Sequence, residues 1–155
     1  MAETMLELDK VNTFYGKAHI LHDLSFKVAA GEVVALLGRN GAGKTTTMRS
    51  IMQLARPRAG SVQFEGAEIT RLATHKVAQA GIGYVPEERR IFGDLTVMEI
   101  LEVGRQPVRE GLPAWTVEHL FELFPNLAER AGNRGKQMSG GEQQMLTIAR
   151  TLMGN

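Results

Sequence analysis

Cysteine is absent from the sequence, which excludes disulfides, thiolate nucleophiles and zinc sites built on thiolates. No apolar stretch approaches the roughly 18 residues that a membrane-spanning helix needs, and the N-terminus has no apolar signal segment. The sequence also lacks an excess of one charge, because it contains 18 Lys and Arg residues and 17 Asp and Glu residues. That balance argues against a nucleic-acid partner. We therefore expect a soluble, cytoplasmic protein that does not insert into a membrane.

The most informative motif that is present occupies residues 38–46. The pattern GxxxxGK[ST] places glycines where a backbone turns around phosphate oxygens, so that amides and a helix N-terminus point at one anion. It predicts that the amides of residues 40–45 cradle a β-phosphate, Lys44 reaches the β- and γ-phosphates, Thr45 binds Mg²⁺ and Thr46 bonds an α-phosphate oxygen. The predicted nucleotide-binding residues here are Gly38, Arg39, Asn40, Gly41, Ala42, Gly43, Lys44, Thr45 and Thr46.

Apolar patterning around this loop indicates an α/β fold. Alternation at 6–8, 24–28 and 62–64 predicts half-buried antiparallel strands. The segments 33–37 and 82–85 lack charged positions and predict strands covered on both faces in a parallel sheet. We therefore expect a mixed sheet.

Helical patterns fill most of the remaining chain. They run from the loop to about residue 54 and then over 70–80, 97–103, 116–124 and 140–153. The last one carries an apolar stripe of Met145, Ala149, Leu152 and Met153, which predicts its buried face. With 155 residues, 43% of them apolar, the chain is long enough for one domain.

A second motif, Met-Ser-Gly-Gly-Glu, begins at Met138. Ser139 and Glu142 have the spacing of a capping box that starts a helix. Capping does not explain Gly140 and Gly141, each of which costs up to about 1 kcal/mol relative to Ala in a helix. Bare amides at a helix start bind anions. The motif therefore predicts a second phosphate contact, compatible with the capping box.

These two motifs together resemble the ATP-binding subunits of ABC transporters, whose second motif is usually Leu-Ser-Gly-Gly-Gln. The resemblance implies a P-loop NTPase fold: a RecA-like mixed sheet core with an antiparallel β subdomain and an α-helical subdomain. It also implies that Ser139, Gly140, Gly141 and Glu142 complete the ATP site of a second ATP-binding subunit in a head-to-tail dimer. ATP and Mg²⁺ are the implied cofactors.

Two further residues acquire roles only through the resemblance. Tyr15 stands where the family has an aromatic ring that stacks on adenine, although a lone strand tyrosine is more often packing. Glu87 stands where the family commonly has a glutamine near Mg²⁺ and the attacking water. The resemblance therefore implies that Glu87, like Lys44, is catalytic, and that Glu87 also contacts the metal. A carboxylate departs from that pattern and adds negative charge near the γ-phosphate. The neighbouring run Glu88, Arg89 and Arg90 is expected to be solvated or to face a partner.

The resemblance is strongest to the smaller ATPase subunits of bacterial branched-chain amino acid importers. It implies transmembrane permease partners and a position on the inner face of the cell membrane. It divides the chain into a β subdomain and ATP-binding core at about 1–86, a helical subdomain at about 87–138, and the signature motif and helix at 139–155. Urea or short-amide import, a soluble non-transport ABC ATPase and a P-loop phosphotransferase remain alternatives.

The family places an apolar strand ending in Asp, a general-base Glu and a γ-phosphate-sensing His after the signature helix. None of these precedes Asn155. We therefore expect an ABC domain that is incomplete at its C-terminus, leaves part of its core uncovered, folds marginally and hydrolyses ATP negligibly. Metal binding by histidine is not expected, because His19 and His22 are three apart in a strand and are predicted to point to opposite faces.

Overall fold

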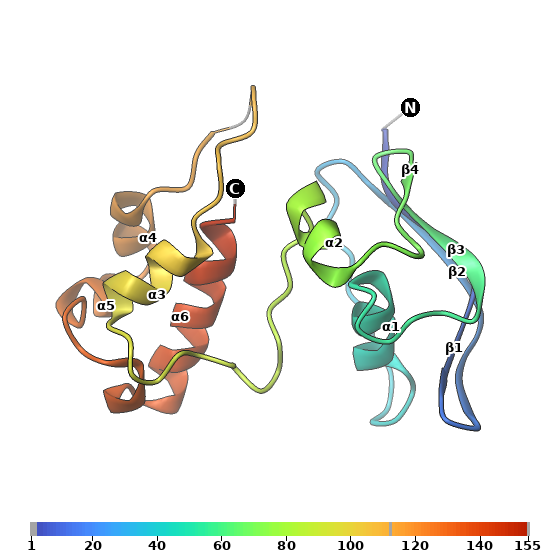
Figure 1. Ribbon diagram of the computed structural model, residues 1–155, viewed down its shortest axis with the longest axis horizontal. Helices are drawn as coiled ribbons and strands as arrows, with labels where there is room; N and C mark the ends of the chain where they lie inside the picture. The colour runs from blue at the N-terminus through green and yellow to red at the C-terminus, as the bar shows by residue number, and fades with distance from the viewer. Residues whose placement is uncertain (1–2, 112, 155) are drawn as a thin grey trace. The chain divides into compact units, whose positions relative to one another are not determined.

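The computed structural model describes residues 3–111 and 113–154. The chain divides into two compact units, Met1–Ile82 (unit 1) and Gly83–Asn155 (unit 2). Unit 1 is an antiparallel sheet with two helices, and unit 2 is helical (Figure 1). The phosphate-loop motif lies in unit 1, and the Ser-Gly-Gly motif lies in unit 2.

The sheet of unit 1 has four strands in the order β2-β1-β3-β4. β1 (Thr4–Tyr15) and β2 (Ala18–Ala29) form a long hairpin, and β3 (Ala59–Phe64) pairs antiparallel with β1. β4 (Ala67–Glu68) is a short addition that the sequence pattern did not predict. The three predicted antiparallel strands are confirmed.

Two helices complete unit 1. α1 (Lys44–Ile51) follows the phosphate loop directly, and α2 (Thr74–Ala80) follows β4. α1 buries Thr47, Ser50 and Ile51, so much of its inward face is polar.

The prediction of parallel strands at 33–37 and 82–85 is wrong. Neither segment is a strand, and the sheet is antiparallel throughout those residues. Val33 and Leu37 are 97% and 87% exposed instead of buried. A parallel strand takes its ladder hydrogen bonds from neighbouring strands, and no described strand lies beside 33–37 to supply them. The apolar pattern therefore marks a segment without a sheet partner in the described residues.

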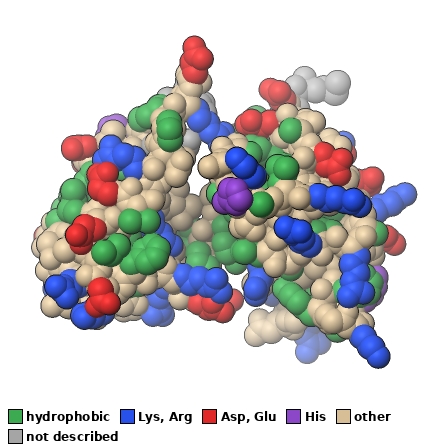
Figure 2. All heavy atoms as spheres, in the orientation of Figure 1, with side chains coloured by type: hydrophobic (Ala, Val, Ile, Leu, Met, Phe, Trp, Pro, Cys, Tyr) green, Lys and Arg blue, Asp and Glu red, His purple; other side chains and the backbone are tan. Residues whose placement is uncertain are grey.

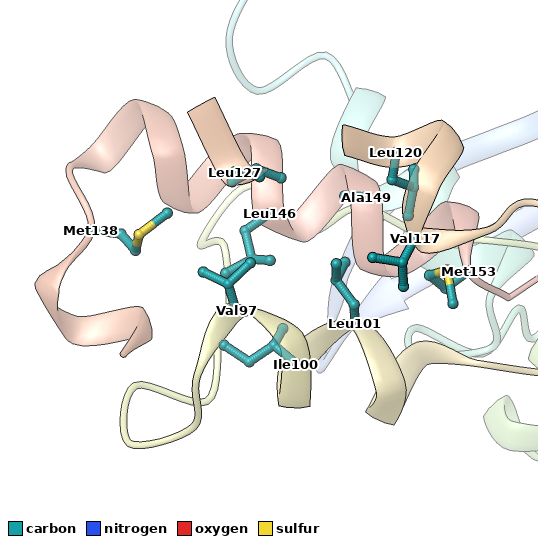
Figure 3. Packing of buried hydrophobic residues seen from close by; sticks show 10 residues of the cluster. All are labelled: Val97, Ile100, Leu101, Val117, Leu120, Leu127, Met138, Leu146, Ala149 and Met153. Atoms are coloured by element: carbon teal, nitrogen blue, oxygen red, sulfur yellow. The ribbon is translucent and has the colours of Figure 1, made fainter. Parts of the chain in front are cut away.

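The described residues of unit 2 form five helical segments around one apolar core. They are α3 (Val97–Gly104), α4 (Val117–Leu123), α5 (Pro125–Glu129), the 3₁₀ helix η1 (Gly135–Gln137) and α6 (Gly140–Leu152). Side chains of α3 and α6 point toward one another in this core, as Figure 3 shows for Leu101, Leu146 and Ala149. Met145 and Leu152 pack at its margin, and Met153 is fully buried, which confirms the predicted stripe. α5 and η1 were not predicted.

Charged side chains of both signs appear on the face of each unit that Figure 2 shows, in keeping with the formal net charge of +1. Within the described residues, no helix has the length and apolar character needed to cross a membrane.

Candidate functional site

The phosphate-loop motif of unit 1 ends at the start of α1. Gly43 is the N-cap of this helix, and no side chain caps it by a hydrogen bond. The first-turn amides of an α-helix have no acceptor within the helix, and their dipoles make this end positive. The start of α1 is therefore open to an acceptor from outside the helix, as an anion site requires.

Gly43 also fits closely against the hairpin. Its φ is 98°, and a Cβ at this position would lie 2.8 Å from the Leu21 Cδ2 atom. Only a residue without a side chain combines this left-handed conformation with this packing. The backbone conformation and the packing thus explain why this motif position is glycine, without reference to any ligand.

Lys44 lies across the loop that precedes it. Its Nζ atom donates hydrogen bonds to the carbonyl oxygens of Gly38, at 2.7 Å, and Arg39, at 2.8 Å. The Ala42 amide also donates to the Arg39 carbonyl, at 3.1 Å, so this amide of the predicted cradle has an internal acceptor. The loop therefore holds its own shape around the ammonium group.

The threonines after Lys44 differ in exposure. Thr45, the predicted Mg²⁺ contact, is exposed, whereas Thr46 is buried. Thr47 is buried as well, and its hydroxyl donates to the Gly43 carbonyl at 2.9 Å, which braces the first turn of α1. Tyr15 stands at the end of β1 and is 44% exposed, so its ring is accessible to a ligand.

In unit 2, Glu87 is exposed within an irregular segment, residues 83–92, that runs along α6. Three side chains of α6 hold the backbone of this segment. The Thr147 hydroxyl donates to the Arg89 carbonyl at 2.8 Å, Arg150 Nη1 donates to the Arg90 carbonyl at 3.0 Å, and Thr151 Oγ1 lies 3.5 Å from the Tyr84 carbonyl. Sequence patterning did not find these links, because they join positions about 60 residues apart.

The Ser-Gly-Gly motif forms the start of α6, and the predicted capping box is present. The Ser139 amide donates to the Glu142 carboxylate at 2.7 Å, and the Glu142 amide donates to Ser139 Oγ at 3.3 Å. The hydrogen bond from the Ser139 amide is the main cause that lowers the pKa of Glu142, helped by the Ser139 hydroxyl and the charge of Arg130. Glu142 is therefore an ionised cap.

The two motif glycines have different surroundings. A Cβ on Gly140 would lie 3.0 Å from Arg89 Nη1, whereas a Cβ on Gly141 would have no atom within 4 Å. Gly141 is therefore exposed at the second position of α6. Packing within unit 2 would allow a larger residue at this position.

The prediction that His19 and His22 point to opposite faces is wrong. Their ring centroids are 3.7 Å apart, and His19 also stacks on Phe14. The hairpin register shifts between Thr13↔Leu21 and Phe14↔His19, which inserts one extra residue into β2 and reverses the alternation there. In the described part of the chain, no cluster of three or more His, Cys, Asp or Glu residues offers a metal site.

Comparisons with known proteins agree with this arrangement. The family model described as "ABC transporter" matches residues 21–155. The "High-affinity branched-chain amino acid transport ATP-binding protein BraG" of Pseudomonas aeruginosa is 44% identical over 96% of this chain and 64% of its own length. The "Nod factor export ATP-binding protein I" of Paraburkholderia xenovorans is 39% identical over 99% of this chain and 50% of its own length. This chain therefore spans between half and two thirds of those relatives.

A solved structure described as "Structure of ATP binding subunit of ABC transporter" aligns with 96% of this chain and 62% of its own, with a TM-score of 0.79 and 29% identity. This likeness confirms the predicted fold class, that of a P-loop NTPase domain with an antiparallel β subdomain and a helical subdomain. The described residues show these subdomains without the paired parallel strands. By sequence and by fold, the chain belongs to the ABC transporter family.

Proposed function

We propose that this chain binds ATP with Mg²⁺ and forms part of the ATP-hydrolysing subunit of an ABC transporter. The observation that carries the proposal is the uncapped start of α1 with the Lys44 ammonium group held over the loop before it. The open amides and the positive helix end suit phosphate oxygens, and the ammonium group adds a point charge. The exposed hydroxyl of Thr45 suits Mg²⁺, which prefers oxygen ligands and is often held beside nucleotide phosphates.

We assign binding of the adenine base to Tyr15. An exposed ring at the end of a hairpin can stack on adenine without reading its edge. Bound Mg²⁺ would neutralise charge that develops on the phosphates. In this proposal Lys44 binds the phosphates and Thr45 holds the ion. Glu87 is assigned separately, as an exposed carboxylate of unit 2 that can orient a water molecule.

The Ser-Gly-Gly motif is assigned to the ATP site of a second ATP-binding subunit in a head-to-tail dimer. Support comes from Gly141, whose missing side chain no contact within unit 2 explains. Bare amides at the start of α6 then receive the partner's phosphates, while Glu142 remains the cap. Closure of this dimer on ATP is the step that would drive a permease.

For the whole subunit, we propose import of branched-chain amino acids with transmembrane permease partners, at the inner face of the cell membrane. The 44% identity to a protein named for branched-chain amino acid transport supports this solute, against 39% for one named for Nod factor export. Urea or short-amide import and a soluble ABC ATPase remain the alternatives.

Titration calorimetry with MgATP tests the binding proposal. The unaltered chain is expected to bind, and Lys44→Ala to lower the affinity at least about tenfold through loss of a charge-assisted contact. The matched control is Lys76→Ala, an exposed lysine in α2 of the same unit. Equal affinities for the two variants, both folded by circular dichroism, would contradict the proposal. Co-purification of the full-length subunit with a permease tests the transport role.

A further inference from the structure

A buried polar contact in unit 1 joins the helix of the phosphate loop to the strand that carries Tyr15. The hydroxyl oxygens of Thr13 in β1 and Ser50 in α1 lie 2.8 Å apart. Both residues are 0% exposed. A Val–Ala pair would fill similar space without needing a partner for either hydroxyl. The polar pair differs from an apolar one in being directional, because a hydrogen bond weakens steeply when its angle changes.

This contact and a second one place the two ends of α1 against the hairpin. At its start, Gly43 packs against Leu21, and near its end Ser50 meets Thr13. Thr13 and Leu21 are cross-strand partners. Both ends of α1 therefore rest on one rung of the β1–β2 ladder, and the hydroxyl pair fixes the second end.

The path through this contact is short and regular. Tyr15 is two residues beyond Thr13 along β1, about 7 Å, and Lys44 is six residues before Ser50 along α1, about 9 Å. The covalent path between Tyr15 and Lys44 instead crosses the whole of β2 and then residues 30–43, which contain no helix or strand. The two contacts of α1 with the hairpin therefore relate the ring to the loop: Gly43 on Leu21 holds the first end of the helix, and the hydroxyl pair sets the direction in which the helix runs from that point.

We propose that Thr13 and Ser50 are positioning residues, whose hydrogen bond sets the distance between the Tyr15 ring and the phosphate loop so that one nucleotide contacts both. The inference rests on the proposed ATP site and adds two residues to it that touch no ligand. It predicts a specific defect: loss of the hydroxyl pair weakens ligands that have both a base and phosphates, and spares ligands that have phosphates alone.

Calorimetry with MgATP and with magnesium tripolyphosphate measures this difference. Thr13→Val is expected to lower ATP affinity about five- to tenfold while tripolyphosphate affinity stays within about twofold. Thr13→Ser, which keeps the hydroxyl, is expected to retain the ratio of the two affinities. Ser50→Ala gives the same comparison with the Thr13 packing intact, so the test stands if Thr13→Val does not fold.

The matched control is Thr70→Val. Thr70 is also a buried threonine of unit 1, and its hydroxyl accepts from the Val62 amide at 2.8 Å, away from α1. Thr70→Val is expected to lower the melting temperature without changing the affinity ratio. A purely structural role for Thr13 would make the two variants alike.

A double-mutant cycle with Tyr15→Ala completes the test. If Thr13 acts through Tyr15, Thr13→Val causes no further loss of ATP affinity in the Tyr15→Ala background. Additive losses, or equal losses for ATP and tripolyphosphate, would overturn the inference while leaving the ATP site intact. If the unaltered chain binds neither ligand, the proposed function fails and the inference fails with it.

Discussion

The hydroxyl of Thr147 lies 2.8 Å from the carbonyl oxygen of Arg89, across 58 positions of sequence. The same hydroxyl is 2.9 Å from the Gln143 carbonyl within its own helix. The Thr147 side chain itself is 0% exposed. The helix that begins with Ser139 thus holds the segment that contains Glu87.

Thr147→Val removes this hydroxyl and nearly preserves the side-chain shape. The Arg89 carbonyl loses a partner, and we expect unit 2 to lose about 1 kcal/mol of unfolding free energy. Hydrogen–deuterium exchange of residues 84–92 is expected to accelerate. Thr151→Val is the control: its contact with Tyr84 is 3.5 Å, so its effect on exchange is expected to be smaller. Equal exchange in all three proteins would count against the contact.

Gly60→Ala is expected to destabilise unit 1 severely. Gly60 is the second residue of β3 and lies where the pairing with β1 shifts register; its φ is 86°, and a Cβ there would overlap the backbone of Lys10 in β1. Backbone atoms of a paired strand cannot move aside, so we expect a loss of about 3 kcal/mol or more in urea unfolding. Gly66→Ala measures the cost of the left-handed backbone conformation without a clash, because the φ of Gly66 is 76° and no atom lies within 4 Å of the added Cβ. That control is expected to lose about 1–2 kcal/mol; similar losses for both would contradict the clash.

Acid is expected to weaken unit 2 through its two glutamate caps. The Thr96 amide, then the Thr96 hydroxyl, lowers the pKa of Glu99, as Ser139 does for Glu142. Because both folded-state pKa values lie below the ordinary 4.5, the caps stabilise fully above that pH and are lost as pH falls through the lowered values. The double variant Glu99→Gln and Glu142→Gln keeps capping geometry without the charge. Its melting temperature is expected to fall less than that of the unaltered chain between pH 6 and about pH 3.

Gly141→Ala separates helix stability from the proposed phosphate contact. With no atom within 4 Å of the new Cβ, the substitution is expected to stabilise the chain by about 0.5–1 kcal/mol. A methyl group at this point is expected to obstruct the partner's phosphates and to weaken ATP-dependent dimerisation of the full-length subunit, measured by sedimentation. Unchanged dimerisation in the stabilised variant would remove the case for the signature contact.

Local patterns predicted the elements that depend on local physics. Alternation found the β1–β2 hairpin and β3, and helical periodicity found α3 and α6 within a residue or two of their ends. The Ser139–Glu142 capping box followed from spacing alone. Elements that are determined by the periodicity of apolar side chains or by a capping residue could therefore be predicted from the sequence.

What could not be predicted depends on partners distant in sequence. The segment 33–37 has the composition of a buried strand, but composition does not say whether a neighbouring strand is present. One extra residue in β2 reversed the faces of His19 and His22 without any sequence signal. The Thr13–Ser50 and Thr147–Arg89 contacts join residues far apart, and a threonine or serine has no sequence mark that distinguishes a buried link from a solvated one.

In the proposed nucleotide site, the two carbonyl contacts of Lys44 would make ligand binding an exchange of hydrogen bonds. An arriving phosphate has to displace the ammonium group from the Gly38 and Arg39 oxygens, so its gain is the difference between two sets of hydrogen bonds. The Gly38 and Arg39 oxygens thus occupy, at the ammonium group, the acceptor positions that phosphate oxygens would take in the proposed site. Measured affinity at this loop is then a competition between the chain's own oxygens and those of the ligand.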